Sequence, residues 1–245
     1  MVSGMRASDA EVVLGRTRAR RWWVEGRRIR SLPRAAKFID DVGFALLFPD
    51  PHVILPALWD AVADADAEPF AAGMGQCEGL VWAWKDELPR RGHAWYGKFI
   101  RGRASLLSPA MLAALYPGRG EARDHERLDL SPAAHRIAEA LRLGPMSSTA
   151  LRAAVGSRSG YARAVGELHR QLVVTAAGVD QTGAGWPATM LDLTCRRFPV
   201  GGTRDPAYAT ARFLDTMIKA TPTDLARVFG WPLAEARAQF AAAAG

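Results

Sequence analysis

The sequence predicts an α+β fold that is mainly α-helical, carries small β-hairpins and is built from several small helical units. Two observations predict it. Apolar residues recur at three- and four-residue spacing in segments that begin at Pro, Ser-Pro or Thr-Pro, and several of these segments end at glycine. Short alternating or β-rich runs follow some of these segments, which indicates hairpins. With 245 residues, of which 49% are hydrophobic, the chain can bury a sizeable core.

The N-terminal part, residues 1–32, is a basic arm. Residues 6–37 contain ten basic and three acidic residues, and the net charge of the whole chain is +7. Such a segment either lies along the phosphates of a nucleic acid or forms a solvated helix face. We expect phosphate contacts from Arg20, Arg21, Arg27 and Arg28 and expect the Trp22-Trp23 pair to dock on the body of the protein.

A first helical unit with an aromatic β-hairpin is expected at residues 33–117. Pro33 opens a buried helix that runs into an extended stretch, a second helix follows Pro56, and Ser108 caps a short closing helix. Alternation predicts strands at 81–85 and 95–100, with Trp82 and Trp84 on one face. Lys98, Arg101 and Arg103 then become phosphate contacts, and the charged residues 118–130 form a linker.

The clearest pattern lies in residues 131–200. Three short helices, opening at Ser131-Pro132, Ser148 and Ser157, precede two strands around a glycine-rich turn. This is the winged-helix order, in which the N-terminal residues of the third helix meet the bases in the major groove. Arg158, Ser159, Tyr161 and Arg163 occupy that position. Winged helices also serve as protein-binding or structural modules, and the turn at 180–186 holds no basic residue.

The last segment, residues 201–245, predicts a helix-turn-helix unit with a mainly structural role. Thr221-Pro222 supplies a cap and a proline at the first helical position, and Gly230 ends that helix. The chain is therefore expected to contain tandem winged-helix or helix-turn-helix units.

Several classes of function lack their sequence signatures. Cys77 and Cys195 have no paired spacing, and the five histidines show neither HxxxH nor HExxH, so we expect no metal and no cofactor. Nucleotide-binding glycine loops and the GxSxG elbow of hydrolases are missing from the sequence. No apolar run reaches the length of a membrane span and no secretory signal is visible, which predicts a cytoplasmic protein with no membrane partner.

The segment TPTDLARVFGWPLAEARAQF resembles the AlkZ-like (YcaQ-type) winged-helix family of bacterial DNA glycosylases, which remove alkylated bases and unhook crosslinks. The residues in comparable order are Asp224, Ala226, Gly230, Leu233, Ala236 and Arg237. The segment GFALLFPDPHVILPALWDAV is similar to the family's catalytic stretch through Gly43, Leu58 and Trp59.

The sequence departs from this family at its catalytic pair. The family carries Gln-x-Gln or Gln-x-Asp to position a water and stabilise the developing oxocarbenium ion, whereas this chain has Leu46 and Phe48 there. A substitute pair with Gln-x-acid spacing is Gln76 and Glu78, which we therefore take as the candidate catalytic residues.

The resemblance implies a protein that binds double-stranded DNA and recognises or repairs DNA with damaged or alkylated bases. The alternative is a winged-helix protein without enzymatic activity, either a transcription regulator or a resistance protein that sequesters a ligand in its tryptophan-rich first half. Preference for a lesion over undamaged duplex separates repair from regulation.

Overall fold

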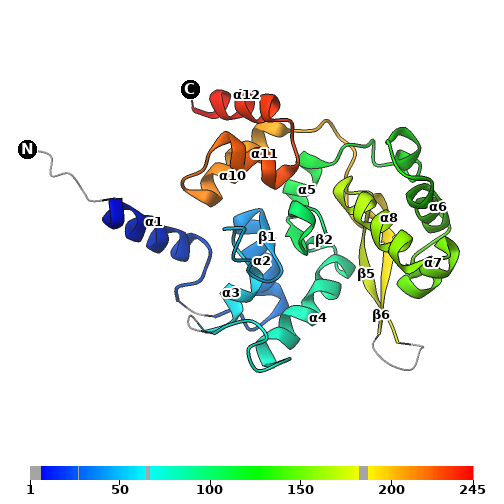
Figure 1. The fold of residues 1–245 in the computed structure, drawn as a ribbon, viewed down its shortest axis with the longest axis horizontal. Coiled ribbons are helices and arrows are strands. Elements are labelled where there is room, and N and C mark those ends of the chain that lie inside the picture. The colour runs from blue at the N-terminus through cyan, green and yellow to red at the C-terminus, as the bar shows by residue number, and fades with distance from the viewer. Residues whose placement is uncertain (1–6, 27, 65–66, 182–186, 245) are drawn as a thin grey trace, which may run out of the picture.

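A computed structural model describes residues 7–26, 28–64, 67–181 and 187–244 and shows a mixed α+β fold (Figure 1). Helices make up most of it, and the strands that the structure describes form two small antiparallel sheets. In the described part of the chain, no helix has the length and apolar character needed to cross a membrane.

The first sheet and its helices form the first segment, residues 32–107; the second segment is residues 132–193. Their order is α2 (Leu32–Val42), β1 (Phe44–Leu46), α3 (Leu58–Val62), α4 (Gln76–Arg90), β2 (Trp95–Gly97), the 3₁₀ turn η1 (Ile100–Gly102) and β3 (Ser105–Leu107). The central strand is β3, since the spatial order is β1-β3-β2. Leu107 of β3 pairs with Phe44 on one side and with Trp95 on the other.

The same order of helices and strands returns in residues 132–193. It consists of α6 (Pro132–Leu141), β4 (Met146–Ser147), α7 (Ser148–Val155), α8 (Arg158–Arg170), β5 (Val174–Asp180) and β6 (Ala188–Leu193), followed by α9 (Thr194–Arg197). Its sheet has the order β4-β6-β5, so the last strand is again central. The three helices and two strands expected here are confirmed, and the short strand β4 is an addition that the sequence did not reveal.

Between these segments lie α5 (Pro109–Leu115) and a second 3₁₀ turn, η2 (Asp124–Arg127). Ser108 caps α5 as expected, because its side chain accepts the backbone N–H of Met111. The structure contains local order within the expected linker: the carboxylate of Asp124 accepts the hydroxyl of Tyr116 at 2.9 Å and the backbone N–H of Gly120 at 2.8 Å.

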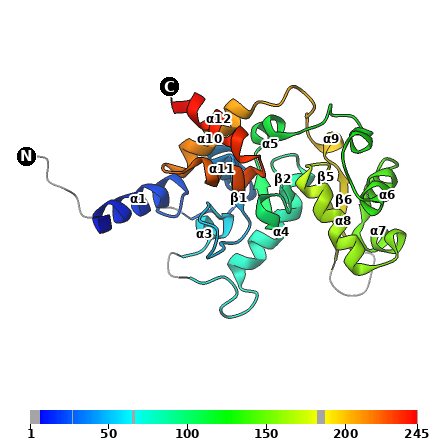
Figure 2. The ribbon, with the colours of Figure 1, turned by 45° about the horizontal axis from the view of Figure 1, so that its top comes forward.

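The C-terminal helices pack on the first sheet. They are α10 (Pro206–Met217), α11 (Pro222–Phe229) and α12 (Leu233–Ala244), drawn in orange and red over α2 and β1 in Figures 1 and 2. Phe44 of β1 stacks on Phe213 with ring centroids 5.8 Å apart and meets Phe229 edge-on at 5.7 Å. The expected cap at Thr221 and the expected helix end at Gly230 are confirmed.

The basic N-terminal segment forms a helix, α1 (Ala7–Arg21), which projects from the body in both ribbon views. Its C-terminal end is anchored: the indole of Trp22 donates to the carbonyl of Thr216 at 2.7 Å, and the indole of Trp23 donates to Asp41 at 2.7 Å. The tryptophan pair therefore docks on the body, as expected from the sequence.

The strand expected at residues 81–85 was wrong, because these residues lie inside α4. The buried residues Val81, Trp84, Lys85 and Leu88 follow helical spacing, and Val-Trp-Ala-Trp-Lys is too short to distinguish this from alternation. Trp82 and Trp84 consequently do not share a face: Trp82 is 41% exposed and Trp84 is buried. The expected hairpin between 81–85 and 95–100 therefore does not form: β2 covers only Trp95–Gly97 of the second expected strand and pairs with β3 instead.

Candidate nucleic-acid interface

Helix α8 exposes a narrow stripe that contains two arginines and several small residues. The side chain of Ser157 begins the helix by accepting the backbone N–H of Gly160 at 3.0 Å. Arg163 and Arg170 are seven residues apart and therefore lie on the same face. Ser159, Ala162 and Gly166 lie along the same stripe. Because these residues are small, an anionic partner can approach the helix backbone closely between Arg163 and Arg170.

The residues predicted at the start of α8 lie together. Arg158, Ser159 and Arg163 are exposed, and Tyr161 is half-buried beneath the guanidinium of Arg152, 5.6 Å from its ring centroid. Burial raises the pKa of the Tyr161 hydroxyl. In the described part of the chain, no ion pair holds Arg158 or Arg163, so both are available to an anionic partner.

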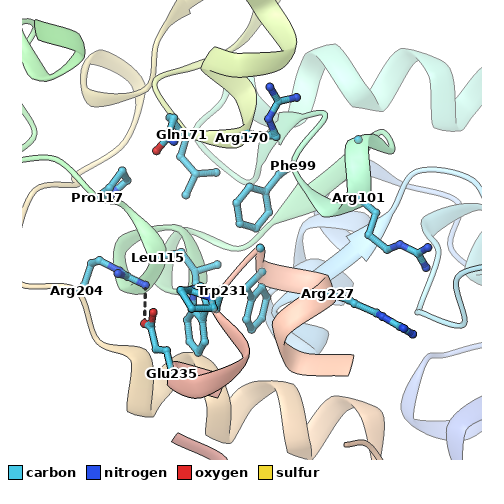
Figure 3. A pocket seen from close by; sticks show the side chains of 15 residues that line it. Phe99, Arg101, Leu115, Pro117, Arg170, Gln171, Arg204, Arg227, Trp231 and Glu235 are labelled. Atoms are coloured by element: carbon cyan, nitrogen blue, oxygen red, sulfur yellow. Dashed lines mark hydrogen bonds and ion pairs between the residues drawn. The ribbon is translucent and has the colours of Figure 1, made fainter. Parts of the chain in front are cut away.

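The C-terminal end of α8 opens on a cleft of about 590 Å³, shown in Figure 3. Its walls come from η1, the end of α5, the C-terminal end of α8, Arg204 before α10, and the α11–α12 turn. Four arginines line it, namely Arg101, Arg170, Arg204 and Arg227. The single carboxylate among its lining residues, Glu235, is paired with Arg204 at 3.3 Å. The cleft therefore carries a positive charge.

Aromatic rings form the floor between these arginines. Phe99, Phe229 and Trp231 line the cleft, and Phe99 and Trp231 lie near its centre in Figure 3. The guanidinium of Arg204 lies over the indole of Trp231, 5.7 Å from the ring centroid. Flat apolar surfaces beside cations suit a ligand that combines planar rings with phosphates.

A smaller cavity of about 250 Å³ extends the positive surface toward α1. It shares Arg101 and Arg227 with the cleft and adds Arg18 and Lys219. Its carboxylate, Asp224, accepts both the hydroxyl and the backbone N–H of Thr221 in a capping box. Basic residues therefore line both cavities, from Arg170 of α8 to Arg18 of α1.

Arg101 occupies a strained position at the junction of the two cavities. Its backbone lies in the left-handed region with φ 51° and ψ 31°, which costs free energy for a residue other than glycine. The following Gly102 has φ 73°, so glycine supplies the second left-handed residue of this turn. The turn directs an exposed arginine toward the cavities, where its guanidinium also donates to the carbonyl of His52 at 3.2 Å.

Lys98 and Arg103, the other predicted phosphate contacts of the first segment, differ in whether an ion pair within the protein already holds them. Lys98 is exposed beside Phe99, and no described ion pair involves it. Arg103 is paired with Asp50. The hydrogen bond from Arg103 also lowers the pKa of the Asp50 carboxyl.

The arginines of the N-terminal arm are partly engaged within the fold. Arg21 pairs with Asp41 at 3.1 Å and Asp215 at 2.6 Å, and only 16% of its side chain is exposed. Arg28 donates to the carbonyls of Val24 and Asp60. Arg20 is exposed and pairs with Glu25 at 3.1 Å. Arg27 lies outside the described residues.

Glu78 of the candidate catalytic pair lies in the first turn of α4 and is 7% exposed. Its carboxylate accepts the backbone N–H of Phe70 at 3.1 Å and the indole of Trp59 at 3.2 Å, and the backbone hydrogen bonds in particular lower its pKa. Gln76 is exposed on the same turn, and neither residue lines the cleft. Through these hydrogen bonds Glu78 connects α4 to Trp59 and Phe70, which is a structural role. Its catalytic role stays a prediction.

Leu46 and Phe48, the positions that the sequence resemblance assigns to the catalytic pair, have apolar surroundings as well. Leu46 is fully buried in β1. Phe48 packs against Phe70 with ring centroids 4.8 Å apart. No side chain at these two positions can orient a water or stabilise a cationic sugar.

Sequence reasoning missed Arg170, Arg204, Arg227 and Trp231. The seven-residue spacing of Arg163 and Arg170 was a visible signal. The other residues reach the cleft only because α10–α12 fold back onto the first sheet.

Comparison with known proteins gives one match. A family model described as "AlkZ related" matches residues 29–225, which is most of the chain. No curated protein and no solved structure matches it.

Proposed function

The chain belongs to the AlkZ-related family, and from this premise we propose that it binds double-stranded DNA across the cleft and recognises duplexes with damaged or alkylated bases. The observation that carries the proposal is the gathering of Arg101, Arg170, Arg204 and Arg227 around one cleft, at the end of the helix that also exposes Arg163. Phosphates follow one another along a duplex, so cations gathered at one surface can contact several of them.

The order of elements supports α8 as the helix that enters the major groove. Residues 132–193 follow the winged-helix order of three helices and three strands, with the last strand in the centre of the sheet. Residues 32–107 repeat that order, which supports the description as tandem winged-helix units. In such units the third helix contacts base edges through its N-terminal residues, here Arg158, Ser159 and Tyr161.

The cleft supports recognition of a damaged duplex over an intact one. A base that is mispaired or alkylated leaves the stack at a lower cost than an undamaged base. Phe99 is half-buried in the cleft beside four arginines, so an extruded nucleotide would find both a ring on which to stack and cations for its phosphates. An intact duplex would gain the phosphate and major-groove contacts but not this stacking contact.

Base excision at the family's catalytic position is not part of this proposal. Leu46 is buried and Phe48 packs on Phe70, so this position lacks the polar group that excision requires. This favours a recognition protein over a glycosylase and keeps the non-enzymatic alternative in view.

The test uses labelled duplexes that are undamaged, alkylated or crosslinked, and scores binding and alkali-sensitive abasic sites together. We expect tighter binding to the lesion-containing duplexes without base release. Equal affinity for all three duplexes would contradict damage recognition and indicate a regulator. Base release would show a glycosylase, and Glu78→Gln would then reveal whether Glu78 takes part.

A further inference from the structure

A cluster of ligand-type side chains lies between η2 and α6, away from the cleft. His125 and Glu126 come from η2 and Glu139 from α6, and each offers one ligand atom within 4.8 Å of the other two. Sequence spacing alone could not reveal this group, because the segment between η2 and α6 must fold back to bring the two elements together. The anchoring of η2 through Asp124 keeps His125 and Glu126 in place.

The geometry points to a divalent transition metal, and we propose that these residues bind Zn²⁺. Nε2 of His125 lies 3.5 Å from Oε2 of Glu139. Two ligand atoms on one tetrahedral Zn²⁺ lie about 3.4 Å apart, because each is about 2.1 Å from the metal. The two atoms are thus too far apart for a good hydrogen bond and correctly spaced to share an ion.

The state of His125 is a second, independent observation. The residue is 2% exposed, and Nδ1 is buried with no hydrogen-bond partner in the described structure. The described hydrogen bonds also leave Nε2 unpaired, so its contact with Glu139 is an ion pair only when the ring is protonated. A buried imidazole without hydrogen bonds is costly, and coordination through Nε2 would give the ring a partner on the side that faces Glu139, whereas Nδ1 would stay without one.

His135 lies beside the cluster, although its ring would have to shift to join the three ligand atoms that lie within 4.8 Å of one another. It precedes Glu139 by one helical turn on α6, so both residues lie on the same face. Its ring centroid is 5.9 Å from that of His125. Two imidazoles and two carboxylates form a nitrogen and oxygen set that suits Zn²⁺, whereas Ca²⁺ and Mg²⁺ prefer oxygen ligands alone.

Arginines neutralise the carboxylates in the metal-free protein. Arg142 pairs with Glu139, and Arg123 lies 3.7 Å from Glu126. Glu139, Glu126 and Arg123 are exposed, and exposed ion pairs contribute little, so a divalent ion can displace these arginines. Binding would join η2 to α6 and fix the start of the second segment.

The experiment measures Zn²⁺ binding by chelator-stripped full-length protein in competition with a chromophoric chelator. We expect one Zn²⁺ per chain with a Kd of about 1 µM or tighter, and a rise in the thermal unfolding midpoint on adding Zn²⁺. Glu139→Gln should weaken binding by about 10-fold or more. The matched control is Glu121→Gln, since Glu121 lies on the same segment, pairs with Arg127 and is outside the cluster.

Circular dichroism shows whether each variant folds, and His135→Ala provides a second variant should Glu139→Gln unfold. Absence of binding tighter than about 100 µM, or equal affinity of wild type and both cluster variants, would overturn the proposal.

Discussion

His169 on the inner side of α8 makes the stability of the protein depend on pH. Its ring is fully buried, meets Trp95 edge-on at 5.9 Å and lies directly against Gly97, where an added Cβ would be 2.6 Å away. Neither ring nitrogen has a hydrogen-bond partner in the described structure. Burial, with a smaller contribution from the charge of Lys98, lowers the pKa of His169 to about 3.

The size of the effect follows from proton linkage. The unfolded chain binds a proton at His169 with a pKa of about 6.5, whereas the folded chain does not until far lower pH. The stabilisation is therefore complete above pH 6.5 and is lost as the pH falls toward the folded pKa. Between pH 7.5 and pH 5 the loss amounts to about 2 kcal/mol.

The titration of Asp60 changes the free energy of unfolding in the opposite direction and partly offsets the loss caused by His169. Burial raises the pKa of Asp60 to about 6, against the opposing charge of Arg28. The folded chain then holds a proton that the unfolded chain releases, so this group adds stability as the pH falls from 7.5 to 5. After allowance for partial exposure the gain is about 1 kcal/mol, and the wild-type profile alone is shallow.

The assay is urea unfolding of wild type and His169→Gln at pH 7.5 and pH 5. Glutamine does not titrate, so the stability of wild type relative to the variant should fall by about 2 kcal/mol between the two pH values. His52→Gln, at an exposed histidine, is the matched control. An unchanged difference between wild type and His169→Gln would refute the assignment of His169 as a buried neutral group.

Two further substitutions test the electrostatics of the first segment by urea unfolding. Asp60→Asn should stabilise the protein by about 2 kcal/mol at pH 7.5 and by about 1 kcal/mol at pH 5, because the amide avoids burial of a charge and the unfolded Asp60 is still ionised at pH 5; equal effects at both pH values would contradict the raised pKa. Glu78→Gln should destabilise by about 1 kcal/mol, because Trp59 and Phe70 lose a charged acceptor; unchanged stability would remove the structural role of Glu78.

Much of the fold could be predicted from local signals. Ser157 before α8 and Thr221-Pro222 before α11 are caps whose side chains make the expected hydrogen bonds. Apolar spacing then predicted α8 after Ser157 and α11 between Thr221 and Gly230, and Gly156 marked the end of α7. Such signals depend on a few neighbouring residues, so tertiary packing does not alter them.

The errors arose where local signals were ambiguous. Val81, Trp84 and Leu88 fit a buried helix stripe, but the run from Val81 to Lys85 by itself also fits alternation. Only the packing of α4 against β5 and the neighbouring strands separates the two patterns. Very short strands such as Met146–Ser147 carry no pattern of their own and form because β6 offers an edge.

The candidate site was predictable only in its α8 portion. Arg158, Ser159, Tyr161 and Arg163 follow one another in sequence, so their place in a winged helix identified them together. Arg101, Arg204 and Arg227 are not close together in sequence and meet in the cleft because η1, the stretch before α10, and α11 converge there. The cluster at His125 and Glu139 could not be predicted for the same reason, because its residues come from two separate elements, η2 and α6.

The most direct test of the cleft as the DNA interface is the salt dependence of duplex binding for wild type and for the double variant Arg170→Ala with Arg227→Ala. If both arginines contact phosphates, the slope of log affinity against log salt should shrink by about 1.8, and affinity at 0.15 M salt should fall roughly 30-fold. Arg91→Ala with Arg136→Ala removes the same charge at exposed positions outside both cavities and should have a much smaller effect. An equal slope and affinity for wild type and the cleft variant would contradict the central claim.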